Sequence, residues 1–365
     1  MKIKALRKAV HNVNPYVPGK TIEEVKRDYN LQRVIKLGSN ENTYGPFPNA
    51  IQAMEEAVKN LNTYPDTSFN EIKDIIAAKY NIDSSYISIA HGSGGILQTI
   101  AQTFIEQGDE ILLPLETYKL YSEISKLMGG IIKEVPLNKD YTIDLDEIQK
   151  KITTSTKLIW LCNPNNPTGT IFDLDAYKRL INNLPDHTWL ILDEAYAEFA
   201  SKHLLPNSIE DIKKGKNIIA VRTFSKAYGL AGARLGYSIS SPKMTSVLET
   251  VSEPFNANKV ALAGATATLT KDEKYYRECM KAIVKERQFL TDSLKEMGFQ
   301  VVKGYTNFVF FNMPYNAAKI SQKLLEKGII VRPCTGWNYP NAIRVTIGTS
   351  EDNKEFIRAL KEVTS

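Results

Sequence analysis

The sequence predicts a two-domain α/β protein whose larger domain contains a mostly parallel sheet of seven strands. Its length of 365 residues is enough for two domains with large cores. Between about residues 86 and 239, short apolar runs rich in β-branched residues alternate with longer amphipathic segments. After about residue 255 this alternation gives way to one long helical pattern and then to short strands and helices, which indicates a smaller α+β domain.

Seven apolar runs are the expected strands of the large sheet, and helical patterns separate several of them. The strands are expected at Ile87–Ala90, Glu110–Leu113, Ile131–Val135, Leu158–Leu161, Trp189–Leu192, Ile218–Val221 and Leu235–Ile239. The helices are expected at Gly95–Ile105, Tyr118–Leu127, Leu174–Leu184 and Ile209–Lys214. Apolar strands separated by helices are typical of a parallel sheet that is covered on both faces and joined by right-handed crossovers.

The rest of the chain predicts the small domain and an N-terminal arm. Its expected elements are the helices Lys274–Met297 and Ala317–Lys327, the strands Val301–Lys303, Phe308–Asn312, Ile329–Arg332 and Ile343–Val345, and a last helix from Asp352. Pro15, Pro18 and Gly19 indicate an extended arm without a core of its own. We therefore expect an arm at residues 1–45 that packs on the small domain, a large domain at 46–258 and a small domain at 259–365.

Composition and charge disfavour several classes of protein. The 46 basic residues are scattered and nearly balanced by 41 acidic ones, so nucleic-acid binding is not expected. There is no signal-peptide pattern at the start and no apolar stretch long enough to span a membrane. Three cysteines without paired spacing fit neither a disulfide framework nor a metal site. We expect a cytoplasmic protein that acts on small molecules.

A glycine-rich turn follows the first expected strand of the sheet. Open parallel sheets bind ligands at the carboxyl ends of their strands, which is where this turn lies. It reads His91-Gly92-Ser93-Gly94-Gly95 and opens a helix. Free N–H groups and the helix dipole favour a phosphate there. A tight structural turn without a ligand explains the glycines equally well.

Three later turns place further polar groups at the same edge of the sheet. Residues 162–169 form a proline-fixed loop that contains three asparagines. Asp193 follows a buried strand directly, and it is either a helix N-cap or a functional acid. Residues 222–234 place Lys226 among small residues, and lysine is a nucleophile when its amine is neutral.

These groups together match what pyridoxal 5′-phosphate needs from a protein. The cofactor needs an amine for an imine, an acid for its pyridinium nitrogen, donors for its phenolate oxygen and a site for its phosphate. Lys226 and Asp193 supply the amine and the acid, and the asparagines of residues 162–169 supply amide donors. The hydroxyl groups of Thr223 and Ser225 and the guanidinium of Arg234 can bind the phosphate.

The complete set of motifs resembles the fold-type I pyridoxal-phosphate aminotransferases, which share the architecture of aspartate aminotransferase. Within this group the chain resembles the histidinol-phosphate aminotransferase family. The segments that carry the resemblance are residues 15–20, 36–46, 162–169, 193–196, 223–236, 331–333 and 343–349. They cover nearly the whole chain.

The resemblance implies a role for each candidate residue. Lys226 would bind the cofactor covalently, Asp193 would pair with the pyridinium nitrogen, and Tyr118 would stack on the ring. Asn166 and Tyr196 would hydrogen-bond the phenolate oxygen. The residues implied for the phosphate are Gly92, Ser93, Gly94, Thr223, Ser225, Arg234 and, from the other subunit of a homodimer with shared active sites, Tyr64. The residues implied for the substrate are Tyr44, His91, Asn166, Arg332 and Arg344.

The implied reaction is amino-group exchange between L-glutamate or 2-oxoglutarate and imidazole acetol phosphate, a step of histidine biosynthesis.

Two departures from the family pattern lie near the substrate. Residues 91–95 replace the usual Asn-Gly-Ser-Asp-Glu, and Thr43 replaces a proline. We expect His91 to be neutral and hydrogen-bonded within its turn.

The departures leave related outcomes open. The alternatives are an aromatic aminotransferase, a phospho-amino-acid decarboxylase and an oxygen-using amino-acid oxidase. A non-catalytic protein of the same fold is the alternative outside enzymes, and the intact Lys226 argues against it.

Overall fold

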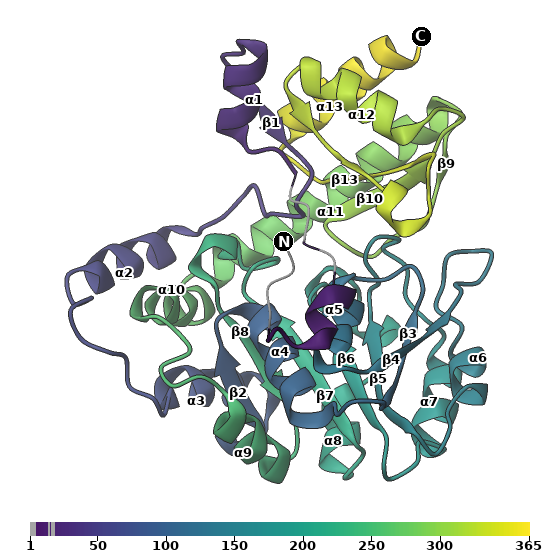
Figure 1. Cartoon of the computed structure of the whole chain (residues 1–365). Coiled ribbons are helices and arrows are strands. Elements are labelled where there is room, and N and C mark those ends of the chain that lie inside the picture. The colour runs from purple at the N-terminus through teal and green to yellow at the C-terminus, as the bar shows by residue number, and fades with distance from the viewer. Residues whose placement is uncertain (1–4, 14, 16–18) are drawn as a thin grey trace.

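A seven-stranded sheet forms the centre of the lower body of the molecule in Figure 1. The computed structural model describes residues 5–13, 15 and 19–365. From one edge to the other the strands are β2 (Ile87–Ala90), β8 (Gly236–Ile239), β7 (Ile218–Thr223), β6 (Trp189–Asp193), β5 (Thr156–Cys162), β3 (Glu110–Pro114) and β4 (Ile131–Val135). In this sheet β8 runs antiparallel to both of its neighbours, and the other six strands all run in one direction. The prediction of a mostly parallel seven-stranded sheet is therefore confirmed.

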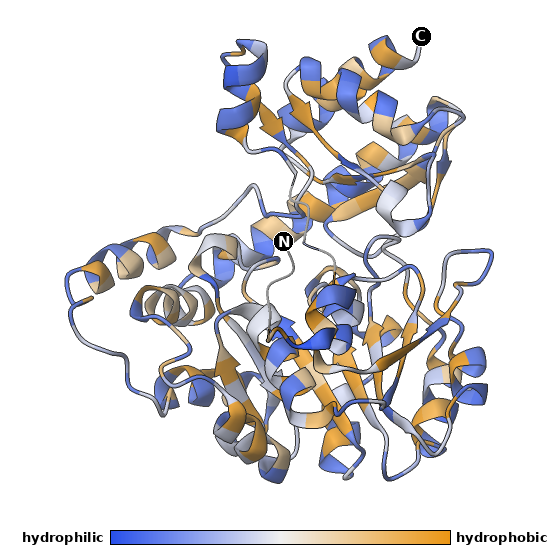
Figure 2. Cartoon of the chain, in the orientation of Figure 1, coloured by the Kyte–Doolittle hydropathy of each residue, from blue (hydrophilic) through white to orange (hydrophobic). Residues whose placement is uncertain are grey.

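Burial explains why these strands were recognisable in the sequence. Residues 158–161 of β5 are completely buried, as are residues 190–192 of β6 and 218–221 of β7. The strands are largely orange in Figure 2, whereas the helices carry blue outer faces. The helices of the lower body are α2 (Pro48–Val58), α3 (Asn70–Tyr80), α4 (Gly92–Phe104), α5 (Leu120–Met128), α6 (Leu145–Lys150), α7 (Leu174–Asn182), α8 (Ser208–Lys213), α9 (Pro242–Val251) and α10 (Lys259–Thr270).

The upper body is built on a four-stranded antiparallel sheet with the order β12-β13-β10-β9. The strands and helices of this part are α11 (Glu273–Glu296), β9 (Gln300–Val301), β10 (Phe308–Asn312), α12 (Ala317–Glu326), β11 (Ile329–Ile330), β12 (Arg332–Pro333), β13 (Ala342–Thr346) and α13 (Ser350–Thr364). The 3₁₀ turns of the chain are η1 (Lys8–Asn12), η2 (Ser84–Tyr86), η3 (Ala197–Phe199), η4 (Lys202–Leu204), η5 (Ala231–Ala233) and η6 (Thr335–Trp337).

The N-terminal arm is not extended throughout, because residues 22–29 form the helix α1 (Ile22–Tyr29). A capping box starts it: the Thr21 side chain accepts from the Glu24 backbone N–H, and the Glu24 carboxylate accepts from the Thr21 N–H. The prediction of an extended arm is wrong for these residues because this local signal favours a helix. Residues 16–18 of the predicted arm motif lie outside the described residues.

The arm contacts both bodies of the molecule. The strand β1 (Ile35–Lys36) pairs in parallel with β11, and α1 contacts α12. The 3₁₀ turn η1 instead packs on α5, where the Arg7 guanidinium donates to the Leu127 carbonyl at 2.9 Å.

The domain boundaries remain a prediction. Since α10 packs on α2 and α3, we propose that the large domain extends through α10. Within the described part of the chain, none of the helices combines the length and apolarity needed to cross a membrane.

Candidate active site

The predicted site residues gather where the carboxyl ends of the central strands face the small sheet. Asp193 ends β6 and Thr223 ends β7, so neighbouring parallel strands deliver their following loops to one edge. Asn166 follows β5 and is joined across the domain boundary to Arg344 of β13. The site therefore lies between the two bodies, as the rule for open parallel sheets predicts.

Lys226 lies in the loop after β7, three residues beyond the end of the strand. Its Nζ donates to the Ser39 carbonyl at 3.2 Å and lies 5.8 Å from the centre of the Tyr196 ring. Burial, and then the positive charge of Arg344, lower the pKa of Lys226 from 10.5 to about 8. A substantial fraction of the amine is therefore neutral near physiological pH, which suits a nucleophile.

Asp193 is buried, and both of its carboxylate oxygens have donors. One oxygen accepts from the backbone N–H of Ala195 at 3.0 Å, and the other accepts from the Tyr121 hydroxyl at 2.7 Å. No α-helix starts at this point, so Asp193 is not a helix cap. Burial raises the pKa of Asp193 to about 6, and the bond from Tyr121 opposes that rise. The carboxylate is therefore mainly ionised at neutral pH.

Asn166, Tyr196 and Arg344 form a buried hydrogen-bonded cluster. The Arg344 guanidinium donates to Asn166 Oδ1 at 2.6 Å and to the Gly38 carbonyl at 2.8 Å. The Tyr196 hydroxyl accepts from Asn40 Nδ2 at 2.9 Å and, more weakly, from Asn166 Nδ2 at 3.5 Å. Its own proton therefore stays available to another acceptor. Asn40 was not among the candidate side chains, although it lies in the arm motif.

A candidate anion site lies at the start of α4, beside Arg234. Gly92 has φ +79°, and a Cβ on it would lie 2.7 Å from an amino nitrogen of Arg234, so only glycine lets the guanidinium come this close. Arg234 also donates weakly to the Ser225 hydroxyl at 3.4 Å, and Thr223 Oγ1 accepts from the Ser225 backbone N–H. These groups and the backbone amides that begin a 13-residue helix, those of Ser93 and Gly94 among them, fit the phosphate of pyridoxal phosphate.

The two predicted substrate arginines lie opposite each other in the small sheet. Arg332 of β12 and Arg344 of β13 are register partners, and their guanidinium carbons lie 5.6 and 5.7 Å from the centre of the Trp337 ring. The indole N–H of Trp337 donates to the Thr117 carbonyl at 2.6 Å, which ties this loop to the large domain. The predictions did not include Trp337, because no spacing in the sequence connects it with the arginines.

Tyr118 and Tyr121 form an aromatic pair beside Asp193. Tyr118 follows β3, and its ring meets the Tyr121 ring edge-on with centroids 5.5 Å apart. The predictions also missed Tyr121. Its three-residue spacing from Tyr118 at the start of a helix was the available signal.

Tyr44 and Tyr64 make their contacts with other residues than those of this cluster. The Tyr44 hydroxyl donates weakly to the Gly348 carbonyl at 3.4 Å, and burial raises the pKa of Tyr44 to about 12. Tyr64 lies in the loop between α2 and α3, is 75% exposed, and stacks on Phe255 with centroids 4.2 Å apart. An exposed ring at this place is compatible with a contact to another subunit.

His91 does not make the hydrogen bond expected within its turn. Its ring is exposed and forms no hydrogen bond to any described residue, so this prediction is wrong. The ring instead packs over Gly95, where a Cβ would lie 2.9 Å from Cε1. The missing side chain at Gly95 makes room for the imidazole one turn along the helix. A Cβ on Gly94, in contrast, would make only an ordinary contact with Leu120, at 3.9 Å.

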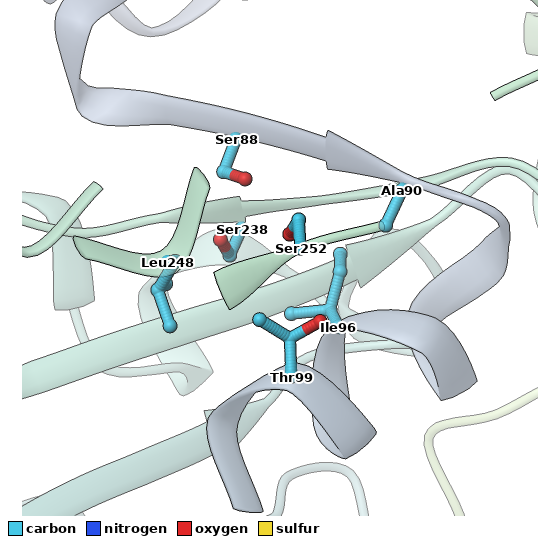
Figure 3. Close-up of a pocket in the computed structure, with 7 residues that line it drawn as sticks. All are labelled: Ser88, Ala90, Ile96, Thr99, Ser238, Leu248 and Ser252. Carbon is cyan, nitrogen blue, oxygen red and sulfur yellow. The ribbon is translucent and has the colours of Figure 1, made fainter. Parts of the chain in front are cut away.

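A small pocket lies between the sheet and two helices, apart from this cluster (Figure 3). Side chains from β2, β8, α4 and α9 line it, among them Ser88, Ser238, Ile96 and Leu248. It contains no residue of the candidate site. The residues that the structure describes also include no cluster of His, Cys, Asp and Glu that could hold a metal.

Known proteins resemble this chain over nearly its full length. Residues 32–360 match the family described as aminotransferase class I and II. A histidinol-phosphate aminotransferase of Caldicellulosiruptor saccharolyticus is 42% identical over 357 residues, 98% of this chain and 99% of that protein. A second, of Moorella thermoacetica, is 38% identical over 358 residues, 98% of this chain and 92% of that protein.

A solved structure agrees with the sequence relatives. It is the histidinol-phosphate aminotransferase of Sinorhizobium meliloti in complex with pyridoxal-5′-phosphate. It superposes with a TM-score of 0.89 at 27% identity and covers 99% of this chain and 98% of that one. The fold and these similarities show that the chain belongs to the histidinol-phosphate aminotransferase family of the class I and II aminotransferases, whose cofactor is pyridoxal 5′-phosphate.

Proposed function

We propose that this transaminase exchanges an amino group between L-glutamate and imidazole acetol phosphate, with its cofactor bound to Lys226. The observation that carries the substrate assignment is the pair Arg332 and Arg344 over the Trp337 ring, joined to the site through Asn166. Guanidinium groups bind carboxylates and phosphates through paired N–H donors. One pair of arginines can therefore receive the carboxylates of glutamate and, in the other half-reaction, the phosphate of the second substrate.

Each side chain of the cluster has a task that its contacts support. When bound, pyridoxal phosphate supplies a carbonyl carbon for the amino group and a ring that accepts electrons from the substrate Cα. Lys226, with its pKa lowered to about 8, would take the proton from the substrate Cα as a base and, as an acid, would deliver it to the carbon of the cofactor that carries the amino group. Ionised Asp193 would keep the ring nitrogen protonated.

Asn166 and Tyr196 orient the phenolate side of the ring. Because Arg344 occupies Oδ1 of Asn166, the amide must present its Nδ2 to the ligand. The Tyr196 hydroxyl accepts from Asn40 and so keeps its proton for donation. Arg344 therefore supports both the amide and the substrate's anionic group.

The alternatives keep the cofactor and change the outcome. Membership of an aminotransferase family contradicts the non-catalytic alternative. An aromatic aminotransferase, a phospho-amino-acid decarboxylase and an oxygen-using oxidase differ in product, so one substrate panel separates them. The relatives named as histidinol-phosphate aminotransferases favour the phosphorylated substrate.

The experiment follows the spectrum of the bound cofactor after one substrate at a time is added. L-Glutamate and histidinol phosphate should each convert the cofactor to its amine form, whereas histidinol without phosphate should react at least tenfold more slowly. Carbon dioxide release and oxygen consumption should be absent. If another amino acid reacts and histidinol phosphate does not, the proposed substrate is wrong and the cofactor chemistry stands.

Lys226→Ala is the matched control for the cofactor attachment. Borohydride should fix the cofactor on Lys226 in the natural protein, and the variant should carry no adduct and show no turnover. An adduct on a different lysine would contradict the assignment.

We also propose a cytoplasmic homodimer whose active sites are shared. The exposed ring of Tyr64 supports a contribution to the partner's site. All three cysteines, Cys162, Cys279 and Cys334, are free and buried, which fits a reducing compartment.

A further inference from the structure

Tyr121 touches both residues that we expect to hold the cofactor ring. It is the second residue of α5 and is completely buried. Its hydroxyl donates to an Asp193 carboxylate oxygen at 2.7 Å. The edge contact between the two rings, at 87°, joins it to Tyr118. One side chain thus connects the proposed partner of the ring nitrogen with the proposed stacking ring.

The Tyr121 ring is fixed from its other side as well. It stacks on Trp160 of β5 with centroids 5.4 Å apart and an interplanar angle of 4°. The Trp160 indole N–H donates to the Ser125 hydroxyl at 3.1 Å, and Ser125 lies on α5 as Tyr121 does. The strand and the helix therefore hold the stack together, and the phenol is directed at the carboxylate.

We infer that Tyr121 is a positioning residue for transamination. Its hydroxyl keeps Asp193 ionised and oriented toward the ring nitrogen of the cofactor, and its ring sets the tilt of the Tyr118 ring. This inference rests on the proposed function of Asp193. A phenol that donates to a carboxylate stabilises the charged form, so its loss makes Asp193 easier to protonate. The groups that face Asp193 are Tyr121 from α5, Cys162 from β5, Glu194 and Tyr196 from the segment that follows β6, and Lys226 from the loop after β7.

The chain offers a matched control in Tyr177 of α7. Tyr177 is also buried, stacks on Phe172 at 5.6 Å and donates to Asp211 at 2.9 Å, outside the candidate site. Tyr121→Phe and Tyr177→Phe each remove one phenol–carboxylate hydrogen bond without a change of ring size. The two variants should lower the midpoint of thermal unfolding by similar amounts.

Only Tyr121→Phe should change the site. In the protein without cofactor, ¹³C NMR of labelled aspartate should show the Asp193 carboxyl, assigned with Asp193→Asn, titrating about one pH unit higher, a tenfold change in its proton affinity. In the loaded enzyme, kcat should fall about tenfold with little change in KM, and the acid limb of the pH–rate profile should move to higher pH by the same unit. Tyr177→Phe should leave all three measurements unchanged.

One further variant serves as a control, and two results would contradict the inference. Trp160→Phe keeps the hydroxyl, so Asp193 should titrate as in the natural protein. An unchanged Asp193 titration in Tyr121→Phe, or an equal loss of kcat in both tyrosine variants, would overturn the inference. The titration needs neither cofactor nor substrate, so a wrong substrate assignment would leave this result intact.

Discussion

Gly92 and Gly94 lie two residues apart at the start of α4, yet the space around a side chain at the two positions differs. Gly92 has φ +79°, and its Cα faces the Arg234 guanidinium. A Cβ on Gly94 would meet only a Leu120 methyl group, at 3.9 Å. We therefore expect the candidate anion site to require glycine at position 92, whereas Gly94 would contribute only a backbone amide.

We therefore predict opposite results for the two alanine variants. Gly92→Ala should destabilise the fold by about 1–3 kcal/mol through its left-handed backbone and weaken cofactor binding at least tenfold. Gly94→Ala should bind the cofactor normally and raise stability by up to about 1 kcal/mol, because alanine favours a helix. Urea unfolding measures the stability of each variant, and titration with the cofactor measures its binding. Equal losses in the two variants would show that the anion site does not depend on the approach of Arg234.

The charge of Lys226 gives a second prediction for a single residue. With its pKa lowered from 10.5 to about 8, the amine loses its proton as the pH rises through about 8. The rate at which pyridoxal phosphate attaches to the protein should therefore rise with pH to a plateau whose midpoint lies near 8. Arg344→Met removes a charge that lowers this pKa, so the midpoint should move upward. Stopped-flow absorbance measures the rate, and a midpoint above 10 in the natural protein would contradict the prediction.

At the scale of elements, a comparison of two glycines that end helices tests how the N-terminal arm is held. Gly298 follows α11 and Gly328 follows α12, with φ of +81° and +79°. A Cβ on Gly298 would meet nothing within 4 Å, whereas one on Gly328 would lie 2.8 Å from the Arg33 carbonyl oxygen. The Gly328 carbonyl also accepts from the Ile35 N–H at 2.8 Å, so this turn anchors β1.

Gly298→Ala should cost only the strain of a left-handed residue, about 1–2 kcal/mol. Gly328→Ala should cost at least about 1 kcal/mol more, because its Cβ would press on the backbone next to β1. Limited proteolysis should then cut near residues 30–37 faster in Gly328→Ala than in Gly298→Ala. Equal stabilities and equal cleavage would mean that the arm docks independently of this contact.

At the scale of the whole molecule, Tyr64 tests the shared active site. A chain with Tyr64→Phe keeps Lys226, and a chain with Lys226→Ala keeps Tyr64. If Tyr64 acts on the partner's cofactor, a hybrid dimer of the two contains one site with both groups. Mixing the two variants should therefore restore natural cofactor affinity at half of the Lys226 sites, measured by equilibrium dialysis. Tyr64→Phe dimers alone should bind about tenfold more weakly, the loss expected for one hydrogen bond to a charged group.

The sequence by itself determined the central sheet and predicted most side chains of the candidate site. Apolar runs such as 158–161 are readable because a strand buried on both faces needs a continuous run, and all seven predicted strands exist within two residues at each end. Asp193 was identifiable because it ends such a strand, and Lys226 because it lies in the loop after one. Capping signals such as Thr21 and Glu24 were present as well, but the prolines beside them suggested an extended arm.

Only the tertiary structure decided which side chains meet. Asn40 and Tyr196 are 156 residues apart, and Tyr121 and Asp193 are 72 apart, so no local spacing connects them. The pairing of Arg332 with Arg344 depends on a strand register, and the place of His91 depends on the space above Gly95. The sequence states which chemical groups are present, whereas packing between distant segments sets their hydrogen bonds and pKa values.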